Sequence, residues 1–363
     1  MMSKEVAYKD LIAFHPGSYV EDIINELNMT QEEFSKRLGV SAKTISKIIS
    51  GKESISKDIA NKLAKMTGIS VKTWFNLQEK YDLEVIKIKN QQNEDKEIEV
   101  VNQIDFGYFK RNNLVDNQRY SVKEKIESLR KLLKLSNLTI LEKFNSVVSY
   151  RNSKDFATKS IINSNVMLEL AINKARNVTD NKYDKVKLKK YLPDIREMSL
   201  ERPESFYKNL KKILLDCGIV LIPLAKLPNS NLNGATKKFR NGSVLLLITD
   251  KNKWSDIFWF SLVHELGHIY YGDFYSDSEK GKEYENKEQK ADKFALDFFI
   301  PQNQYDDFVQ GNDFSYDSVK KFAEQLKISP SIIVGRLQYD KYIGYQSLNG
   351  LRESYFIKMD DED

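Results

Sequence analysis

The chain has 363 residues, a formal net charge of +5 and 41% hydrophobic residues. Such a chain is long enough for two or three domains, because domains usually have about 100 to 200 residues. Its aromatic content of 11% excludes a wholly disordered chain, and no uncharged apolar run reaches the roughly 18 residues that a membrane helix needs. We therefore expect a soluble protein of more than one domain that does not enter a membrane.

The charge is distributed unevenly along the chain. Residues 1–83 have 12 Lys and Arg against 11 Asp and Glu, residues 84–250 have 31 against 20, and residues 251–363 have 14 against 21. The three balances are therefore +1, +11 and −7. A basic middle region suits an acidic partner, but solvated helix faces explain most charge runs and are our default interpretation.

The N-terminus and the cysteine content both indicate the cytoplasm. The opening MMSKEVAYKD lacks the apolar core of a secretory signal. Cys217 is the only cysteine, so the chain forms no internal disulfide. Because Cys217 precedes the apolar run GIVLIPL, we expect a small buried side chain there and not a catalytic thiol.

The segment around residues 30–49 has the pattern of two short helices joined by a tight turn. Thr30 and Glu33 have the spacing of a capping box, Gly39 ends the first helix, and Ser41 begins the second. Each helix has an apolar face at helical spacing, made by Phe34, Leu38, Ile45, Ile48 and Ile49. Two short helices that bury facing sides across a tight turn form a helix-turn-helix.

The outward face of the second helix carries small and cationic groups, which can approach base edges and phosphates in a DNA major groove. The residues that we expect to contact DNA are Gln31, Ser41, Lys43, Thr44, Ser46 and Lys47. The alternative is a small helical bundle with a solvated face, and the near-neutral charge of this segment favours that alternative.

Residues 15–83 resemble the HigA-type antitoxin domain, a branch of the XRE, lambda-repressor-like family of DNA-binding proteins. The resemblance runs from HPG at the start through ISKDIANKLAKMTG to the closing TWFNLQEKYDL, so it covers the whole domain. It implies binding to double-stranded operator DNA as a homodimer. Trp74, Leu77 and Tyr81 form an apolar stripe that we expect in the core, with a dimer interface as the alternative.

The middle of the chain gives no catalytic signature. Residues 87–100 are polar and without apolar periodicity, so we expect a linker there. Ser121 and Glu124 then form a second capping-box pattern ahead of a helix with one apolar face. We expect further helices to about residue 215.

A small sheet is expected from about residue 218. The run GIVLIPL is β-branched and bounded by Gly and Pro. Residues 234–249 contain two strand-like segments joined by Asn241 and Gly242, which is a strong hairpin signal.

The segment FWFSLVHELGHIYYGD, residues 258–273, is apolar on every side, which is typical of a buried helix. Burying two imidazoles and a carboxylate there is unfavourable unless they find partners. His264 and His268 lie about 40° apart on one helix face, so both can bind one Zn²⁺. Glu265 lies about 60° from His268 and can accept a proton from an attacking water. The alternative is a pair of core histidines that backbone carbonyls satisfy.

A zinc site with one open position needs a third protein ligand. In the following segment NKEQKADKFALDFFIP, Glu288 and Asp292 are four residues apart on one helix face. We expect Glu288 as the ligand, with Glu285 as the alternative, and we expect Asp292 to orient a ligand histidine by accepting a hydrogen bond. Surface acids on an amphipathic helix are the other interpretation. We do not expect His15 to bind the metal.

HELGH followed by EQKADKFA closely resembles the ImmA/IrrE family of metallopeptidases, whose motif is HExxH followed by ExxA[ND]xFA. The resemblance spans about residues 204–310 and implies zinc ligands at His264, His268 and Glu288, with Glu265 as the catalytic base. It also implies that a sheet edge, here in residues 234–249, holds the substrate backbone as an added strand. Residues 311–363 resemble the closing helices of this domain.

No motif assigns the group that stabilises the oxyanion of a peptidase reaction. Four tyrosines lie close to the histidine motif in sequence: Tyr270, Tyr271, Tyr275 and Tyr284. None of them has a spacing that distinguishes it from the others.

The sequence therefore predicts a mainly α protein with a small β-sheet. We expect an all-α helix-turn-helix domain at 1–83, a helical middle region at 84–203 and an α+β, zincin-like metallopeptidase domain at 204–363. The predicted function is a DNA-binding transcriptional regulator of antitoxin type with a fused zinc-dependent endopeptidase, acting on a regulatory protein or a cognate toxin. The alternative is a non-catalytic antitoxin that represses its operon and sequesters a toxin, with zinc only structural.

Overall fold

A computed structural model describes residues 5–143, 158–251, 253–274 and 282–357 of the chain. The chain divides into two compact units, Met1–Glu97 and Ile98–Asp363. As expected, the fold is mainly helical, and its described strands form one two-stranded and one three-stranded sheet. No described helix is long and apolar enough to cross a membrane.

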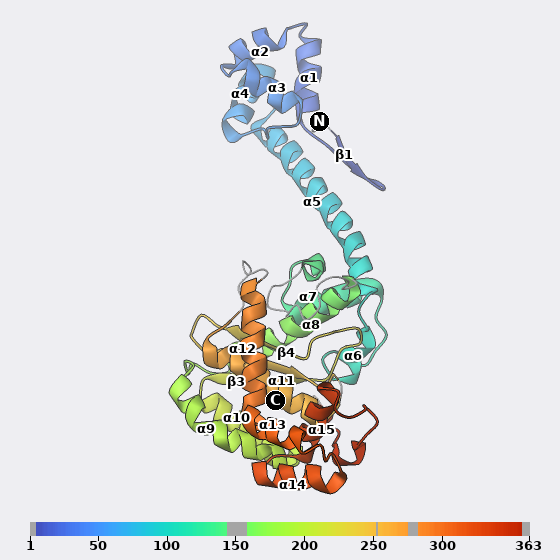
Figure 1. The fold of residues 1–363 in the computed structure, drawn as a ribbon. Helices are drawn as coiled ribbons and strands as arrows, with labels where there is room; N and C mark the ends of the chain where they lie inside the picture. The colour runs from blue at the N-terminus through green and yellow to red at the C-terminus, as the bar shows by residue number, and fades with distance from the viewer. Residues whose placement is uncertain (1–4, 144–157, 252, 275–281, 358–363) are drawn as a thin grey trace. The chain divides into compact units, whose positions relative to one another are not determined.

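The first unit consists of a hairpin and the helices that follow it (Figure 1). Its elements are β1 (Glu5–Tyr8), β2 (Leu11–Phe14), α1 (Gly17–Glu26), α2 (Gln31–Leu38), α3 (Ala42–Ile49), α4 (Lys57–Thr67) and the larger part of α5 (Val71–Val101). The antiparallel β1–β2 hairpin was not predicted. Its turn consists of Lys9 and Asp10 and contains no glycine, so it lacks the usual hairpin signal.

The two helices predicted for the helix-turn-helix are α2 and α3. Thr30 caps α2 by accepting a hydrogen bond from the Glu33 amide, and Ser41 caps α3 in the same way. The Glu33 carboxylate pairs with Arg37, at 2.9 Å, and not with the cap backbone. Only the Thr30 half of the predicted capping box is therefore present. Gly39 ends α2 in the left-handed conformation, as predicted.

The core of the first unit is formed by the facing sides of α1 to α5. Its largest buried side chains are Phe34, Ile45, Ile48, Leu63 and Trp74. Trp74 is completely buried, and Leu77 packs against this core while being partly exposed. The Trp74 end of the predicted apolar stripe therefore belongs to the core of this unit.

The linker predicted at residues 87–100 is helical and belongs to α5. The segment is rich in Lys, Glu and Gln, which are good helix formers even where apolar periodicity is absent. The β1–β2 hairpin contacts this part of the helix, because the Tyr8 hydroxyl donates to Asp95 at 2.6 Å and the Lys9 ammonium at 2.8 Å. The boundary between the two units follows Glu97 and lies inside this segment, so the segment links the units as predicted, with a helical conformation that polar composition alone does not reveal.

The second unit begins with helices and continues into a sheet and a second set of helices. The first helices are α6 (Phe106–Arg111), α7 (Val122–Leu133), α8 (Thr158–Ala175), α9 (Lys185–Glu197) and α10 (Pro203–Asp216). The sheet and later helices are β3 (Ile219–Leu224), β4 (Gly234–Lys238), β5 (Val244–Thr249), α11 (Ser255–Tyr271), α12 (Lys282–Phe299), α13 (Gln302–Gln310), α14 (Tyr316–Leu326) and α15 (Pro330–Tyr339). The capping box predicted at Ser121 and Glu124 is complete.

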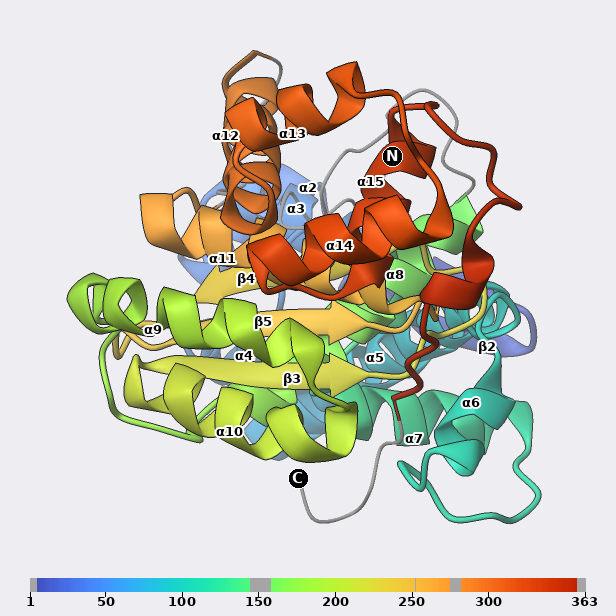
Figure 2. The ribbon, with the colours of Figure 1, turned by 60° about the horizontal axis from the view of Figure 1, so that its bottom comes forward.

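The sheet of this unit has the strand order β3-β5-β4, with β5 in the middle (Figure 2). β3 pairs with β5 in parallel, and β4 pairs with β5 antiparallel, as the hairpin signal predicts. The connection is longer than the Asn241–Gly242 pair alone, because the Phe239 amide still donates to the Ser243 carbonyl at 2.8 Å. Gly242 has a φ of 92°, so the loop is of the three-residue type that needs glycine at its last position.

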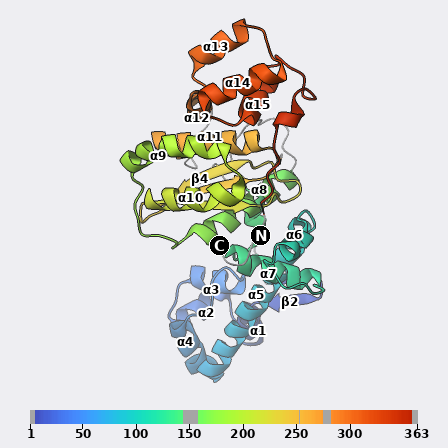
Figure 3. The same ribbon diagram turned by 90° about the horizontal axis from the view of Figure 1, so that it is seen from below.

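Different helices cover the two faces of the sheet, whose side chains alternate between them. Leu221, Leu246 and Ile248 lie in one core with residues of α10, α11, α14 and α15, while Val220, Leu245 and Leu247 lie in a second core with α7 and α8. Figure 3 shows α13, α14 and α15 grouped beside α11 and α12. Because α7 and α8 share a core with the strands, the helices before residue 204 belong to the same unit as the sheet.

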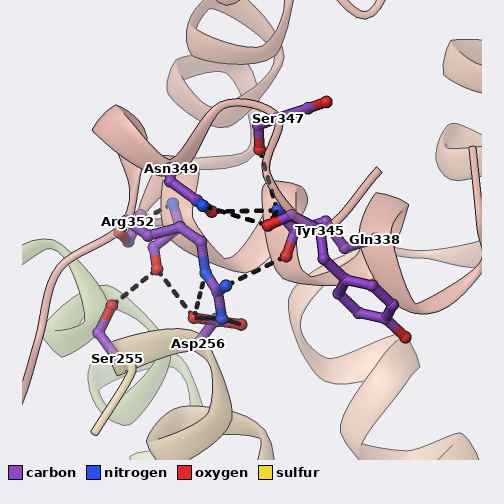
Figure 4. Close-up of polar contacts among 9 residues, drawn as sticks. Ser255, Asp256, Gln338, Tyr345, Ser347, Asn349 and Arg352 are labelled. Carbon is purple, nitrogen blue, oxygen red and sulfur yellow. Dashed lines mark hydrogen bonds and ion pairs between the residues drawn. The ribbon is translucent and has the colours of Figure 1, made fainter. Parts of the chain in front are cut away.

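The C-terminal segment forms hydrogen bonds and an ion pair with the first turn of α11 (Figure 4). The Arg352 guanidinium contacts both carboxylate oxygens of Asp256, at 2.8 and 2.9 Å, and each side chain is 7% exposed. Arg352 also donates to the Gln338 side chain of α15 at 3.1 Å. The Ser255 amide donates to the Glu353 carbonyl at 2.9 Å. The start of α11 is therefore held between α15 and the C-terminal segment. Ser329 caps α15, and Pro330 is its first residue.

Candidate metal centre and nucleic-acid interface

The predicted metal site lies where α11 and α12 pack against each other (Figure 1, orange). The two helices approach closely at Gly267, where an added Cβ would lie 3.2 Å from the Ala291 Cα. One turn of helix separates His264 from His268, and both point their Nε2 atoms to the same side of α11. Glu288 comes from the second turn of α12.

The structure brings His264, His268 and Glu288 together in a buried cluster. The two Nε2 atoms are 3.1 Å apart, and the Glu288 carboxylate oxygens lie 3.5 Å from His264 Nε2 and 3.3 Å from His268 Nε2. Among the residues that the structure describes, no other group of three such side chains is close enough to share an ion.

The donor set fits a zinc ion on chemical and geometric grounds. Two imidazoles and a carboxylate are ligands that zinc accepts, and ligand atoms about 2.0 to 2.1 Å from a tetrahedral centre lie about 3.3 Å apart. The observed separations of 3.1, 3.3 and 3.5 Å are close to that value. All three residues are at most 8% exposed, so a shared cation would compensate for burying them.

Asp292 contacts the other side of the His264 ring. Its Oδ1 lies 2.8 Å from His264 Nδ1, and its side chain is 39% exposed. With a proton on Nδ1, His264 donates to this carboxylate and keeps an Nε2 lone pair directed at His268 and Glu288. Asp292 therefore lies where the sequence analysis expects an orienting group.

Glu265 lies between α11 and the sheet. It is 5% exposed, and a Cβ added to Gly234 would lie 2.7 Å from its Cγ and 3.0 Å from its Oε1. Any larger residue at position 234 would displace the glutamate. The sequence analysis did not identify Gly234, although a glycine inside a strand pattern is a known sign of close approach.

The other candidates from the sequence do not join the cluster. Glu285 is exposed on the first turn of α12. Tyr270 stacks on Phe294, and Tyr271 is 46% exposed. Tyr275 and the Tyr284 side chain lie outside the described residues. No described tyrosine is therefore assigned as an oxyanion stabiliser.

Two further side chains are structural, as expected. Cys217 is completely buried, and burial raises the pKa of its thiol to about 11, so it is not a reactive thiolate at neutral pH. His15 is 1% exposed, and its Nδ1 accepts a hydrogen bond from the Gly17 amide at 3.0 Å.

The predicted DNA-contacting residues form an exposed surface of the first unit. The residues Gln31, Ser41, Lys43, Ser46 and Lys47 are exposed, and Thr44 is half-buried. The Thr44 hydroxyl lies 2.9 Å from that of Ser41, at the N-terminus of α3. Lys47 pairs with Glu53 at 3.3 Å, whereas the described residues form no ion pair with Lys43. Of the two lysines, Lys43 is therefore the more available for a phosphate.

Two family models match different parts of the chain. A helix-turn-helix model matches residues 20–74, which include α2 and α3. A peptidase model, the IrrE N-terminal-like domain, matches residues 226–338. The second match contains the β4–β5 hairpin, the histidine motif and Glu288.

Three proteins are similar to a short part of the chain. The HTH-type transcriptional regulator YddM of Escherichia coli (strain K12) is 31% identical over 68 residues, which are 19% of this chain and 72% of that protein. A crystal structure titled as an antidote protein of a plasmid maintenance system from Nostoc punctiforme is 36% identical and covers 24% of this chain and 93% of its own, with a TM-score of 0.22. An addiction module antidote protein of a HigA family from Coxiella burnetii is 30% identical and covers 23% and 94%, also with a TM-score of 0.22.

Proposed function

Because the chain belongs to the HTH-type transcriptional regulators and carries an IrrE N-terminal-like peptidase domain, we propose that it is an operator-binding regulator of antitoxin type with a fused zinc-dependent endopeptidase. Its substrate is a regulatory protein or a cognate toxin. The observation that carries the proposal is the buried cluster of His264, His268 and Glu288 beside Glu265.

In this proposal His264, His268 and Glu288 hold the zinc ion. A bound zinc ion polarises a peptide carbonyl and increases the acidity of water. Asp292 keeps the proton of His264 on Nδ1, at the 2.8 Å contact, and so keeps Nε2 available as a ligand atom. The chain's own contribution at this step is therefore to fix the tautomer and orientation of one imidazole.

Glu265 acts as the proton carrier of the proposed reaction. It accepts a proton from the attacking water and passes it to the amine that leaves. Its position against Gly234 supports this role, because the carboxylate, which follows His264 in the chain, then lies against the strand proposed to hold the substrate. Burial at 5% exposure also keeps bulk water away from the carboxylate.

The β4 edge is the proposed binding site for the substrate backbone. The Thr249 amide donates to the Asn233 carbonyl and the Phe239 amide to the Ser243 carbonyl, so alternate residues from 233 to 239 bond to β5. In an antiparallel pair the residues between them direct their amides and carbonyls away from the partner strand. Gly234, Thr236 and Lys238 therefore direct their backbone groups away from β5, which is the geometry that an added strand needs.

The substitution Glu265→Gln tests the catalytic claim. We expect the variant to bind zinc as the parent chain does, because no ligand is changed, and to lose cleavage by at least about 100-fold because the proton carrier is missing. The measurement is incubation of the zinc-loaded chain with the product of the gene adjacent to its own, followed by mass spectrometry of the fragments.

One control variant belongs to this experiment. Glu285→Gln, an exposed change on the same pair of helices, should leave cleavage intact. Cleavage at the parent rate by Glu265→Gln would exclude the proposed role of Glu265. A chain that holds zinc and binds the neighbouring gene product without cutting it would favour the non-catalytic antitoxin.

The first unit is the proposed operator-binding module, acting as a homodimer. The exposed residues of α3 and the caps at Thr30 and Ser41 support this role. In a helix-turn-helix the second helix enters the major groove, and lysines near it contact phosphates. Each phosphate contact releases counterions and makes the affinity more sensitive to salt.

The double substitution Lys43→Ala with Lys47→Ala tests the DNA claim. We expect weaker binding to a duplex from the promoter of its own gene, and a plot of log affinity against log salt that is less steep by about two. Fluorescence anisotropy over a series of salt concentrations measures both effects. Lys65→Ala, an exposed change on α4, is the matched control. Unchanged affinity and slope in the double variant would place the DNA on another surface.

A further inference from the structure

Alternate side chains of the outer strand β4 share the face of the sheet on which α11 lies. Gly234, Thr236 and Lys238 pair with Ile248, Leu246 and Val244 of β5, which lie in the core that contains α11. The three side chains therefore share the α11 face of the sheet. Gly234 meets Glu265, and the Lys238 ammonium lies 5.9 Å from the ring of Phe274, just beyond the end of α11.

The β4 strand and its turn are basic and lack ion pairs. Lys237, Lys238 and Arg240 form no ion pair with any residue that the structure describes. Lys237 points to the other face, because it pairs with Leu245, which lies in the core that contains α8. Its charge also acts on Glu169 of α8: burial raises the pKa of the Glu169 carboxyl, and the Lys237 ammonium acts in the opposite direction. Lys238 is exposed and lies on the α11 face of β4.

Thr236, between Gly234 and Lys238, also indicates a missing partner. It is 2% exposed, and its hydroxyl oxygen has no hydrogen-bond partner among the described residues. A buried hydroxyl without a partner is costly, and a hydrogen bond from a bound peptide would satisfy it. The α11 face of β4 therefore combines an unsatisfied hydroxyl with an unpaired cation.

We propose that the β4 edge selects extended peptide segments with an acidic side chain, recognised by Lys238. This inference rests on the proposed peptidase function and names the substrate class of the same site. Residues directly opposite each other on paired strands have Cβ atoms about 5 Å apart on the same face. Lys238 is four residues from Gly234, the β4 residue that lies against Glu265. The selected Asp or Glu therefore lies four residues from the substrate residue that faces Gly234.

The test uses a library of decapeptides in which each position in turn is fixed as Asp, Lys or Ala. At one position relative to the cleaved bond, the zinc-loaded full-length chain should cut peptides with Asp about fivefold faster than peptides with Ala. The expected size follows from an exposed ion pair, which contributes up to about 1 kcal/mol. Lys238→Glu should reverse the preference to Lys at the same position. Mass spectrometry of the products gives both the rates and the position.

Lys237→Glu is the matched control, because it changes the charge of the same strand by the same amount on the opposite face. It should keep the preference for Asp. An unchanged preference in Lys238→Glu, or an equal loss in both variants, would overturn the proposal. Loss of binding to single-stranded DNA in Lys238→Glu, with peptide preference unaltered, would also overturn it and assign the lysine to nucleic acid.

A second arm separates this inference from the peptidase claim. The immobilised Glu265→Gln chain is mixed with the same library, and the retained peptides are identified. If the parent chain cuts no peptide, Glu265→Gln can still retain Asp peptides and lose this selectivity when Lys238→Glu is added. In that case the β4 edge binds acidic peptides, and only the proposed peptidase reaction is wrong. No enrichment in this arm and no Asp preference in cleavage would contradict the inference.

Discussion

The three histidines of the chain occupy two different environments. His264 and His268 face each other and Glu288, so their nitrogens have a shared centre to which they can be directed. His15 is instead enclosed in the first unit, where its ring meets Tyr81 edge to face at 4.8 Å. Its Nδ1 accepts a hydrogen bond from the Gly17 amide and must therefore be unprotonated in the folded unit.

This environment predicts how the first unit responds to pH. Burial lowers the pKa of His15 below its ordinary 6.5, and the smaller effects of Asp82 and the Ile48 backbone act in the opposite direction. Below pH 6.5 the unfolded chain therefore binds a proton that the folded unit does not, so stability falls as the pH falls through 6.5 toward the lower folded value. The loss is about 1.4 kcal/mol for each unit between the two values.

The measurement is a histidine NMR titration of the full chain, with the His15 signal assigned by its absence in His15→Gln. The expected midpoint for His15 is below 6.5. A midpoint above that value would mean that the folded unit stabilises the charged ring, and the predicted direction of the stability change would then be wrong.

At the level of single residues, the sequence predicts those side chains whose spacing helical geometry fixes. His264, His268 and the Glu288–Asp292 pair follow from four-residue intervals on two helices. Gly234 and Thr236 were not identified, because their importance depends on how β4 lies against α11. That contact joins segments about thirty residues apart in the chain, so no periodic pattern within either segment predicts it.

At the level of elements, α11 is held at its start by a buried ion pair. Asp256 and Arg352 are each 7% exposed, and an added Cβ at Gly335 of α15 would lie 2.2 Å from an Asp256 oxygen. Burial raises the pKa of the Asp256 carboxyl, and the Arg352 guanidinium acts in the opposite direction. Each charge therefore compensates for the loss of hydration of the other, and removing one would leave the other buried and uncompensated.

The substitution Arg352→Met should lower the free energy of unfolding of the second unit by about 3 kcal/mol, because it leaves Asp256 buried and uncompensated. Scanning calorimetry of the full chain measures the loss. Lys187→Met is the matched control: it removes an ion pair with Asp216 whose side chains are 47% and 45% exposed, and it should cost less than about 1 kcal/mol. Equal losses in the two variants would contradict the assigned importance of the buried pair.

The elements that the sequence predicted well are those with strong local signals. The caps at Ser41 and Ser121 begin helices where expected, and the Asn241–Gly242 signal marks a hairpin. The helical conformation of the linker at residues 87–100 was not predicted, because a polar helix has no apolar period, and the β1–β2 hairpin was not predicted because its turn is charged. Both errors concern elements whose stability comes from propensity or from contacts distant in sequence.

At the level of the whole molecule, two units with different chemistry share one chain. Residues 1–83, which form most of the first unit, have a charge balance of +1, so any affinity of this unit for DNA must come from a local surface and not from its net charge. The second unit contains the buried cluster of His264, His268 and Glu288 and the basic edge strand. The proposed proteolysis by the second unit and the proposed operator binding by the first should therefore be separable by substitutions in one unit at a time.

The central claim is that His264, His268 and Glu288 bind one zinc ion. Metal analysis of the purified full-length chain by mass spectrometry tests it most directly. The account predicts about one zinc per chain in the parent and in Glu265→Gln, and loss of most of the zinc in His264→Ala and Glu288→Ala, because each removes one of three protein ligands. A folded parent chain without zinc in a zinc-containing medium, or full zinc retention by Glu288→Ala, would contradict the account.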